Sequence, residues 1–335
     1  MINLVLIFSL FNLLLSVIIW LYGEKIFILD KPDSNRKSHK FPVPLAGGTI
    51  IISNIMLILL FSQLDNFNEI NSIFFYSRES IFSFYVGSFL IFLIGLYDDK
   101  YNIKPNIKLI LLILIILSVI LIDEDLIINE LYFSSFNFHT TLDNFSIFFT
   151  ILCFLLFLNA VNMFDGINLQ LPLYALSLFL VLIYVNNDTQ IFFIIMVCLF
   201  FIILLNSRNK LFFGDNGSLL IAYILAYFII KSNNIASSIK PEEIFLLMMI
   251  PGIDMFRLFL QRIISNKHPF KPDNNHLHHI MLKKFKFPIT LILIQLLILM
   301  PIIFYYLGFI DIIISILITF LIYLFLITNT LWLKK

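Results

Sequence analysis

Five polar clusters interrupt an otherwise apolar chain, and each contains residue types that bind cations or phosphate. They are the loop 30–48, Asp98-Asp99, the stripe 159–165, the glycine-flanked segment 214–218, and the histidine-rich loop 268–279. Each cluster lies at the end of an apolar segment. Because charged groups are costly near a bilayer, polar groups gathered at segment ends predict a functional site there.

The composition predicts an all-α integral membrane protein. The 335 residues are 60% hydrophobic and 13% charged, with a mean hydropathy of +0.99, whereas a soluble domain carries about 25% charged residues. About eleven apolar segments (10–11) have the character of membrane-spanning helices. They cover residues 2–22, 45–64, 81–97, 107–122, 144–164, 169–185, 190–206, 218–230, 244–264, 287–307 and 309–332. The short segment 218–230 must begin earlier, inside the preceding loop, or bend.

The loop charges predict the orientation. If the loops alternate across the membrane, 18 Lys and Arg residues fall on one side and three on the other. The basic side is expected to be cytoplasmic. The N-terminus is then outside, the C-terminus is inside, and all five polar clusters lie on cytoplasmic loops.

The remaining segments suggest one polytopic domain over residues 1–335. The first apolar segment lacks a basic start and a small-residue cleavage site, so it is not expected to be a cleaved signal peptide. Cys153 and Cys198 lie inside spans and are expected to be unpaired. The loop 123–143 contains an alternating run that could form a short hairpin.

Adjacent carboxylates at Asp98 and Asp99 suit metal or phosphate chemistry, with one of them able to act as a base. They follow an apolar run, where they meet the negative end of a helix dipole and repel each other. Pro105 is expected to start the next helix, which would place Lys108 close to the same surface. The alternative is a solvated loop neutralised by Lys100 and Lys104.

Asn159, Asn162 and Asp165 are spaced three residues apart, so they share one helix face. Their oxygen atoms suit Mg²⁺, although a polar seam between membrane helices is the alternative. In the segment 214–218, Asp215 at a helix start could hold a cation while free backbone N–H groups meet phosphate. A simple helix cap explains the same residues.

Two loops carry cationic and hydrogen-bonding groups. The loop 30–48 is basic and stiffened by proline, and it suits either phosphate or anionic lipid. The loop 268–279 holds four of the six histidines. The lack of Cys makes a zinc site unattractive there, so pyrophosphate binding is favoured. Asp254 and Arg257, three residues apart, could form an ion pair that supports this loop.

Taken in order, the five clusters resemble the polyprenyl-phosphate N-acetylhexosamine-1-phosphate transferases, glycosyltransferase family 4. The matching patterns are Asp-x-Pro-x-x-Arg-Lys-x-His-x-x-Pro-x-Pro-x-x-Gly-Gly at 30–48, Gly-x-x-Asp-Asp at 95–99, Asn-x-x-Asn-x-x-Asp-Gly at 159–166, Gly-Asp-x-Gly-Ser at 214–218 and Pro-Phe-x-Pro-Asp-x-x-His-Leu-His-His at 269–279. The histidine pattern is similar to the branch that uses UDP-N-acetylhexosamines rather than UDP-MurNAc-pentapeptide.

The resemblance implies site residues in three groups. Asp98, Asp99, Lys108 and Asp165 are expected to be catalytic. Asp215 and Asn162 are expected to hold Mg²⁺, with Mn²⁺ as a substitute. The expected substrate-binding residues are Asn159, Asn168, Phe212, Gly214, Arg36, Lys37, His39, Gly47, Gly48, His276, His278 and His279.

The implied reaction moves HexNAc-1-phosphate from UDP-HexNAc to undecaprenyl phosphate and releases UMP, which begins a cell-surface polysaccharide of the O-antigen, capsule or teichoic acid type. The implied location is the bacterial inner membrane, with no nucleic acid partner and with a homodimer left open. Bacterial relatives usually continue Asp-Gly-Leu/Ile-Asp-Gly-Leu, but here Asn168, Leu169 and Gln170 stand in the second half. Eukaryotic relatives carry a similar Asn, which is implicated in uracil recognition.

Three other classes compete with this interpretation. A transporter of nucleotide sugar or of a lipid-linked intermediate would place its polar site near the bilayer midplane, where this chain has chiefly Asp254 and Arg257. A prenyltransferase with an aromatic acceptor would need Asp-x-x-x-Asp clusters, which Asp98-Asp99 does not begin. A UDP-MurNAc-pentapeptide transferase would carry a different histidine pattern.

Overall fold

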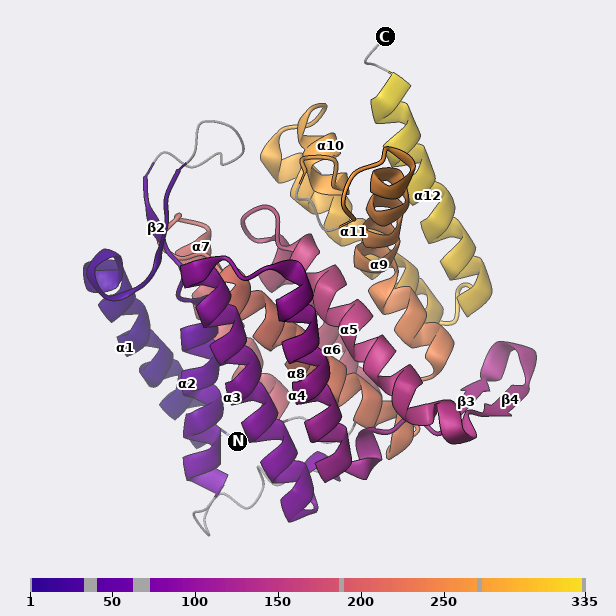
Figure 1. Ribbon diagram of the computed structural model, residues 1–335, viewed down its shortest axis with the longest axis horizontal. Helices are drawn as coiled ribbons and strands as arrows, with labels where there is room; N and C mark the ends of the chain where they lie inside the picture. The colour runs from indigo at the N-terminus through magenta and orange to yellow at the C-terminus, as the bar shows by residue number, and fades with distance from the viewer. Residues whose placement is uncertain (1, 33–40, 63–72, 187–189, 270–272, 333–335) are drawn as a thin grey trace.

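Helices dominate the computed structural model, which describes residues 2–32, 41–62, 73–186, 190–269 and 273–332 (Figure 1). The helices are α1 (Ile2–Ile26), α2 (Gly47–Ser62), α3 (Arg78–Tyr101), α4 (Pro105–Ile122), α5 (Ser146–Phe164), α6 (Gln170–Val185), α7 (Gln190–Asn206), α8 (Gly214–Asn234), α9 (Pro241–Ile264), α10 (Leu277–Leu282), α11 (Phe287–Tyr306) and α12 (Ile312–Trp332). Each of the eleven apolar segments expected from the sequence coincides with one of the long helices.

The chain is an all-α membrane protein with about 77% of its residues in helices. Among the described residues, five helices are long and apolar enough to cross a membrane by themselves: Leu4–Ile26, Arg78–Tyr101, Pro105–Ile122, Asp143–Phe164 and Phe287–Tyr306. The helices α2, α6, α7 and most of α12 are apolar but shorter. The outer surface of the bundle carries many exposed Leu, Ile and Phe side chains, as a lipid-facing surface does.

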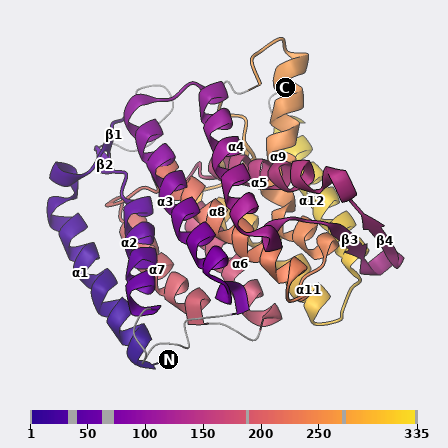
Figure 2. The same ribbon diagram turned by 60° about the horizontal axis from the view of Figure 1, so that its bottom comes forward.

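Helix α8 is the central element, and it contacts α2, α3, α5 and α6 (Figure 2). Nearly all of its side chains are buried. It begins at Gly214, so the short apolar segment 218–230 does extend back into the preceding loop. Its first turn is packed tightly, because a Cβ atom on Gly48 or Gly95 would collide with Asn216. Only glycine permits α2 and α3 to approach the start of α8 so closely.

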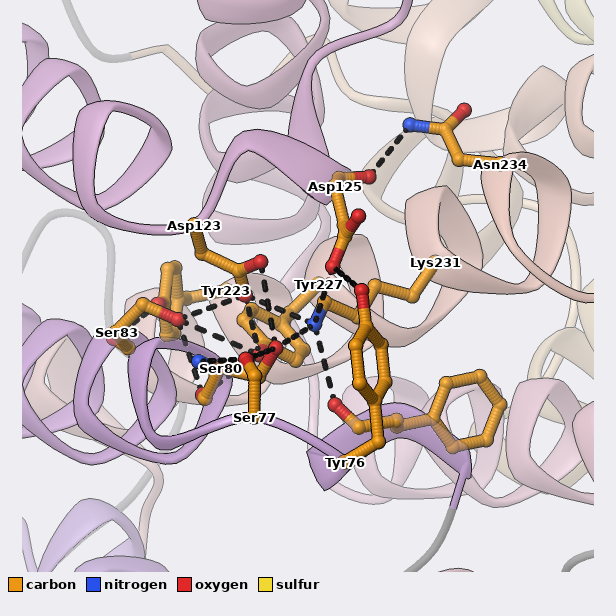
Figure 3. A network of polar contacts seen from close by, with 11 residues as sticks. Tyr76, Ser77, Ser80, Ser83, Asp123, Asp125, Tyr223, Tyr227, Lys231 and Asn234 are labelled. Atoms are coloured by element: carbon orange, nitrogen blue, oxygen red, sulfur yellow. Dashed lines mark hydrogen bonds and ion pairs between the residues drawn. The ribbon is translucent and has the colours of Figure 1, made fainter.

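A buried ion pair fastens the opposite end of α8 (Figure 3). Lys231 Nζ lies 2.8 Å from Asp123 Oδ2, and both side chains are almost completely removed from solvent. The ammonium also donates to Ser80 Oγ at 2.6 Å and to the carbonyl of Phe74 at 3.1 Å. The Tyr227 hydroxyl donates to Asp123 at 2.9 Å. All three ammonium protons therefore have acceptors, as burial of a charge requires.

The short strands lie outside the helical bundle. Strands β1 (Leu29–Asp30) and β2 (Val43–Pro44) pair antiparallel. Strands β3 (Glu130–Phe133) and β4 (Phe138–Thr141) form the hairpin expected within 123–143. Glu242 of α9 fastens the tip of this hairpin by accepting the backbone N–H of Ser135 at 3.1 Å. Cys153 and Cys198 are free thiols, as expected.

Candidate active site

The polar clusters meet in one cleft of about 1700 Å³. The cleft lies where α3, α5 and α7 end and α4, α6 and α8 begin, at the same end of the bundle as α10 and the β1–β2 ribbon (Figure 1). Thirteen of the expected site residues line it: Asp98, Asp99, Lys108, Asn159, Asn162, Asp165, Asn168, Phe212, Gly214, Asp215, His276, His278 and His279. Arg36, Lys37 and His39 lie outside the described residues.

Lys108 joins the Asp98-Asp99 pair to the segment 214–218. Its Nζ lies 2.7 Å from Asp98 Oδ2 and 2.9 Å from Asp215 Oδ2. Asp98 also accepts the backbone N–H of Ile103 at 2.6 Å, which holds the turn between α3 and α4. Lys108 is in the first turn of α4, as Pro105 predicted. Asp98 and Asp215 therefore face a single cation. In the described part of the chain, neither Lys100 nor Lys104 pairs with Asp98 or Asp99.

Asp99 caps the helix that carries Asp215. Its Oδ1 accepts the backbone N–H of Asp215 at 2.8 Å, and its Oδ2 accepts that of Asn216 at 3.0 Å. These N–H groups belong to the first turn of α8 and have no partner within that helix. A carboxylate from α3 thus satisfies them, and it also interacts with the positive end of the α8 dipole.

The two amides of the expected stripe behave differently. Asn162 Nδ2 donates to Asp215 Oδ1 and to Ser218 Oγ, both at 2.7 Å. Asn159 Nδ2 donates to the carbonyl of Leu155 in its own helix. Asn162 therefore belongs to the carboxylate cluster, whereas Asn159 contributes to the wall of the cleft.

Asp165 ends the stripe as the C-cap of α5. No described residue donates a hydrogen bond to its carboxylate. Burial raises the pKa of Asp165 to about 8, and the charges of Asp215 and Asp99 act in the same direction. At neutral pH this carboxyl is mostly protonated, and an added cation would favour its ionised form.

The segment that departs from the usual bacterial pattern is held by two asparagines at the end of α7. Asn168 Nδ2 donates to the carbonyl of Asn206 at 3.2 Å and to Asn209 Oδ1 at 2.5 Å. Asn206 Oδ1 accepts the N–H of Leu169 at 2.6 Å. Leu169 has a φ of +67°, a conformation in which glycine is unstrained and leucine is not. The usual glycine at this position suits that backbone directly.

Asn206 and Asn209 were not among the site residues expected from the sequence. Both also line the cleft. Asn206 ends an apolar helix as its last residue and is buried. A polar residue in that position was a signal comparable to Asp98, but two asparagines within the four residues 206–209 look like an ordinary turn.

The histidine loop is fastened to α9 through Arg257 and Arg262, each of which belongs to an ion pair. The expected pair of Asp254 and Arg257 is present, with Nη2 2.7 Å from Oδ1. Arg257 Nη2 also donates to the carbonyl of Asn275, so the pair supports the loop as expected. A second, unexpected pair joins buried Arg262 to Asp273 at 2.8 Å.

The three histidine rings pack together at the cleft. His276 and His278 stack with ring centroids 5.4 Å apart, and His279 lies 4.3 Å from His278. His278 is buried against Gly166, where no Cβ could fit. Burial lowers the pKa of His278 well below its usual range, and the neighbouring rings reinforce the effect. His278 is therefore a neutral imidazole.

Gly47 and Gly48 occupy a different position from the other expected site residues. Both are buried at the start of α2 and are not among the residues that line the cleft. Gly47 donates its N–H to the carbonyl of Phe212 at 3.2 Å, and Gly48 packs on Asn216. They hold the start of α8 in place, and their contact with substrate stays a prediction.

The donor set fits a hard divalent cation. Asp98, Asp99, Asp165 and Asp215 line the cleft, and within the described part of the chain Lys108 is the cation paired with them. Carboxylate oxygens in excess over cations suit Mg²⁺. The described residues contain no group of three His, Cys, Asp or Glu placed to hold a metal alone. Water or substrate oxygens would have to complete the coordination, as Mg²⁺ commonly requires.

The fold and the cleft define a multi-pass helical membrane protein with a carboxylate-rich site at one end of its bundle. A family model described as glycosyl transferase family 4 matches residues 81–233. That range contains the carboxylate pair, Lys108, the amide stripe and Asp215. This part of the chain, just under half of its length, is similar to glycosyl transferase family 4.

Similar proteins with assigned names agree with this family. An undecaprenyl-phosphate alpha-N-acetylglucosaminyl 1-phosphate transferase of Salmonella typhi is 24% identical over 77% of this chain and 70% of its own length. A protein of the same name from Thermotoga maritima is 26% identical over 86% and 84%. A probable undecaprenyl-phosphate N-acetylglucosaminyl 1-phosphate transferase of Bacillus subtilis is 25% identical over 80% and 73%.

Proposed function

We propose that this protein transfers HexNAc-1-phosphate from a UDP-HexNAc to undecaprenyl phosphate, giving undecaprenyl-pyrophosphoryl-HexNAc and UMP. The observation that carries the proposal is the bridge from Asp98 through Lys108 to Asp215 at the capped start of α8. It brings carboxylates and a cation into a cleft, where they can bind phosphate groups and a metal. The names of the similar proteins supply the substrate class.

In the proposed topology, eleven helices span the bacterial inner membrane, with the N-terminus outside and the C-terminus in the cytoplasm. The positions of the loops support it, because the basic loops and the cleft share one end of the bundle while the β3–β4 hairpin lies toward the other (Figure 1). A cytoplasmic cleft faces the compartment that contains nucleotide sugars. The lipid substrate would enter from the membrane between apolar helices.

The reaction forms one P–O bond and breaks another. An oxygen of the lipid phosphate attacks the phosphorus that carries the sugar, and the bond from that phosphorus to the oxygen of UMP breaks. Both reactants are anions, so positioning and charge neutralisation supply most of the rate. The second pKa of a phosphate monoester is about 6, so the attacking phosphate is already mostly dianionic at neutral pH.

Each part of the cleft has a proposed role. Lys108, with Asp98, would position the lipid phosphate. Asp215 and Asn162 would hold Mg²⁺, which supplies charge stabilisation at the departing UMP when it is bound. Asp99 maintains the start of α8. We favour direct attack by the lipid phosphate over a covalent aspartyl-phosphate intermediate on Asp98 or Asp99, because no strong base is needed.

The nucleotide would lie along the Asn168 side of the cleft. Both N–H groups of Asn168 have acceptors in Asn206 and Asn209, so its carbonyl oxygen is the group left for a ligand. That oxygen could accept the N3–H of uracil, which cytosine lacks. Phe212, which is only partly buried, would stack on the base.

Transfer of label distinguishes this function from transport. Membranes containing the protein are given UDP-GlcNAc labelled in the sugar and the β-phosphate, together with undecaprenyl phosphate and Mg²⁺. A transferase moves label into an organic phase, whereas a transporter accumulates it in the vesicle lumen. Asp215→Asn should abolish the organic-phase label. Asp143→Asn, the same change at an exposed residue just before α5 and at the opposite end of that helix from the cleft, should preserve it.

A panel of donors then identifies the sugar. UDP-GlcNAc, UDP-GalNAc and deoxygenated relatives differ only in the hexosamine. UDP-MurNAc-pentapeptide is included as the donor of the competing class. Rapid transfer from UDP-MurNAc-pentapeptide would replace the proposed substrate, and isolation of a phosphorylated enzyme without lipid acceptor would replace the direct route.

A further inference from the structure

His276 lies immediately before α10, and its ring lines the cleft. Its Nδ1 lies 3.3 Å from Asp254 Oδ2, an oxygen of a buried carboxylate on α9. The same oxygen accepts the backbone N–H of Leu277 at 3.1 Å. Asp254 therefore holds both the ring of His276 and the peptide that follows it.

The other oxygen of Asp254 is also fully engaged. Oδ1 accepts Arg257 Nη2 at 2.7 Å and the hydroxyl of Tyr323, from α12, at 2.9 Å. Tyr323 in turn accepts a hydrogen bond from Arg257 Nε at 2.9 Å. Four donors on two oxygens fix the carboxylate, so it cannot rotate away from His276.

This arrangement sets the proton positions on His276. An ionised carboxylate only accepts hydrogen bonds, so the Nδ1 facing it must carry the hydrogen. Nε2 is then the nitrogen left for the cleft, and no described residue hydrogen-bonds it. With only Nδ1 protonated, Nε2 presents a lone pair, which repels a phosphate oxygen. A second proton on Nε2 turns it into a donor.

We propose that Asp254 and Tyr323 are positioning residues that present His276 Nε2 to a phosphate oxygen of the nucleotide, so that nucleotide binding takes up a proton at Nε2. The inference rests on the proposed function, because that function supplies the phosphate. The proton comes from solvent, and Asp254 balances the charge that results.

The other groups that face His276 are compatible with this proton. Asp273 contributes a further negative charge from the loop. Arg257 is already paired with Asp254. His278 stacks on His276 as a neutral ring because burial lowers the pKa of its imidazole. His279, also from α10, is the other ring in contact.

Calorimetry of UDP binding to the full-length protein in detergent tests the inference. Titrations at pH 8 in buffers of different ionisation enthalpy give the number of protons taken up per UDP. At that pH a phosphate monoester, whose second pKa is about 6, is almost fully ionised, so UDP has no proton to release. The wild-type protein should take up a measurable fraction of a proton per UDP, with one proton as the limit for a single site.

The variants separate positioning from general structure. His276→Gln should bind UDP with no proton uptake. Asp254→Asn keeps the shape but loses the charge, and it should reduce the uptake. Tyr323→Phe, a milder change should Asp254→Asn fail to fold, should weaken UDP binding severalfold and lower the uptake. Tyr306→Phe is the matched control, because the Tyr306 hydroxyl is buried without a hydrogen-bond partner, and it should leave both values unchanged.

Each result separates the two proposals. UDP binding without proton uptake in the wild-type protein overturns the role of His276 but leaves the transferase proposal standing. Uptake that persists in His276→Gln has the same meaning. No detectable UDP binding, with or without Mg²⁺, overturns the nucleotide proposal and this inference with it.

Discussion

Asp99 caps the helix on which Asp215 stands, with its two carboxylate oxygens 2.8 and 3.0 Å from the backbone nitrogens of Asp215 and Asn216. Adjacent Asp98 instead faces Lys108. Two neighbouring carboxylates thus have separate tasks, one at a helix terminus and one at a cation. The difference arises because successive residues of a helix point in different directions.

Asp99→Asn should weaken the start of α8. The amide keeps one acceptor oxygen but loses the charge, so the free energy of unfolding should fall by about 1–2 kcal/mol. Transfer should fall with it, because Asp215 moves with this turn. Thermal unfolding in detergent measures the first effect. Glu79→Gln, the same change at the exposed opposite end of α3, should be neutral. Equal melting temperatures for the two variants would contradict the capping role.

Asn168→Ala should raise the KM for the UDP-sugar by about tenfold, the value of one neutral hydrogen bond, and should lower kcat much less. The reason is that, in the proposed site, the lost carbonyl oxygen binds the base, which takes no part in the reaction. Steady-state kinetics with purified protein measures both constants. Asn209→Ala, which removes one of the two anchors of Asn168, should have a smaller effect in the same direction. An unchanged KM would make Asn168 a loop-shaping residue only.

Leu169→Gly should leave the stability nearly unchanged. At a φ of +67°, a non-glycine residue is strained by about 1–2 kcal/mol, and release of that strain should offset the lost side-chain contacts. Leu173→Gly, one turn further along and inside α6, should lower the free energy of unfolding by about 1 kcal/mol or more. Chemical or thermal unfolding of the two variants side by side provides the comparison. A larger loss at Leu169 than at Leu173 would be the contrary result.

Mg²⁺ added at pH 7 should release a proton from the protein. Burial and the neighbouring carboxylates raise the pKa of Asp165 to about 8, so this carboxyl is mostly protonated one pH unit below that value. A bound divalent cation favours the ionised form, and the proton is then lost to solvent. A pH-sensitive dye in weakly buffered solution detects it. The release should vanish at pH 9.5 and in Asp165→Asn, and persistence in that variant would assign the proton elsewhere.

Lys231→Met should destabilise the protein by about 3–5 kcal/mol, because it leaves Asp123 buried without its cation. The double variant with Asp123→Leu should recover much of that loss, since an apolar pair of similar volume replaces the charges. Thermal unfolding of the single and double variants forms the test. If the double variant is no more stable than Lys231→Met, the neighbouring serines and tyrosines carry the stability instead of the ion pair.

The helices could be predicted from sequence because long apolar runs leave little alternative in a membrane. That the polar residues gather at one end of the helical bundle followed from the same reasoning, because they stood at every second helix end along the chain. Lys108 was placed correctly through Pro105, which fixes the first turn of a helix. These expectations depend on residues close together in the chain.

The tasks of individual residues depended on contacts between distant segments. Asp99 is a cap only because α3 packs beside α8, more than a hundred residues later. His278 was expected to bind phosphate; its ring is buried and neutral against Gly166 at the edge of the cleft, and its contact with substrate stays a prediction. Gly47 and Gly48 matched a motif, yet what the structure shows is close helix packing. No pattern of neighbouring residues in the sequence distinguishes a helix cap, a buried ring or a helix-packing glycine from a residue that binds substrate.

Helix α8 is held at both ends by groups of other helices: Asp99 at its start, and Asp123 and Ser80 around Lys231 near its end. During synthesis, α3 is therefore complete long before its partner exists. A nascent chain that stops short of residue 214 carries Asp99 and Asp123 without the α8 groups that satisfy them, whereas Asp98 already has Lys108. The cleft is assembled only when α8 enters among helices already made, so truncated chains should be recognised and degraded rather than retained as partly active protein.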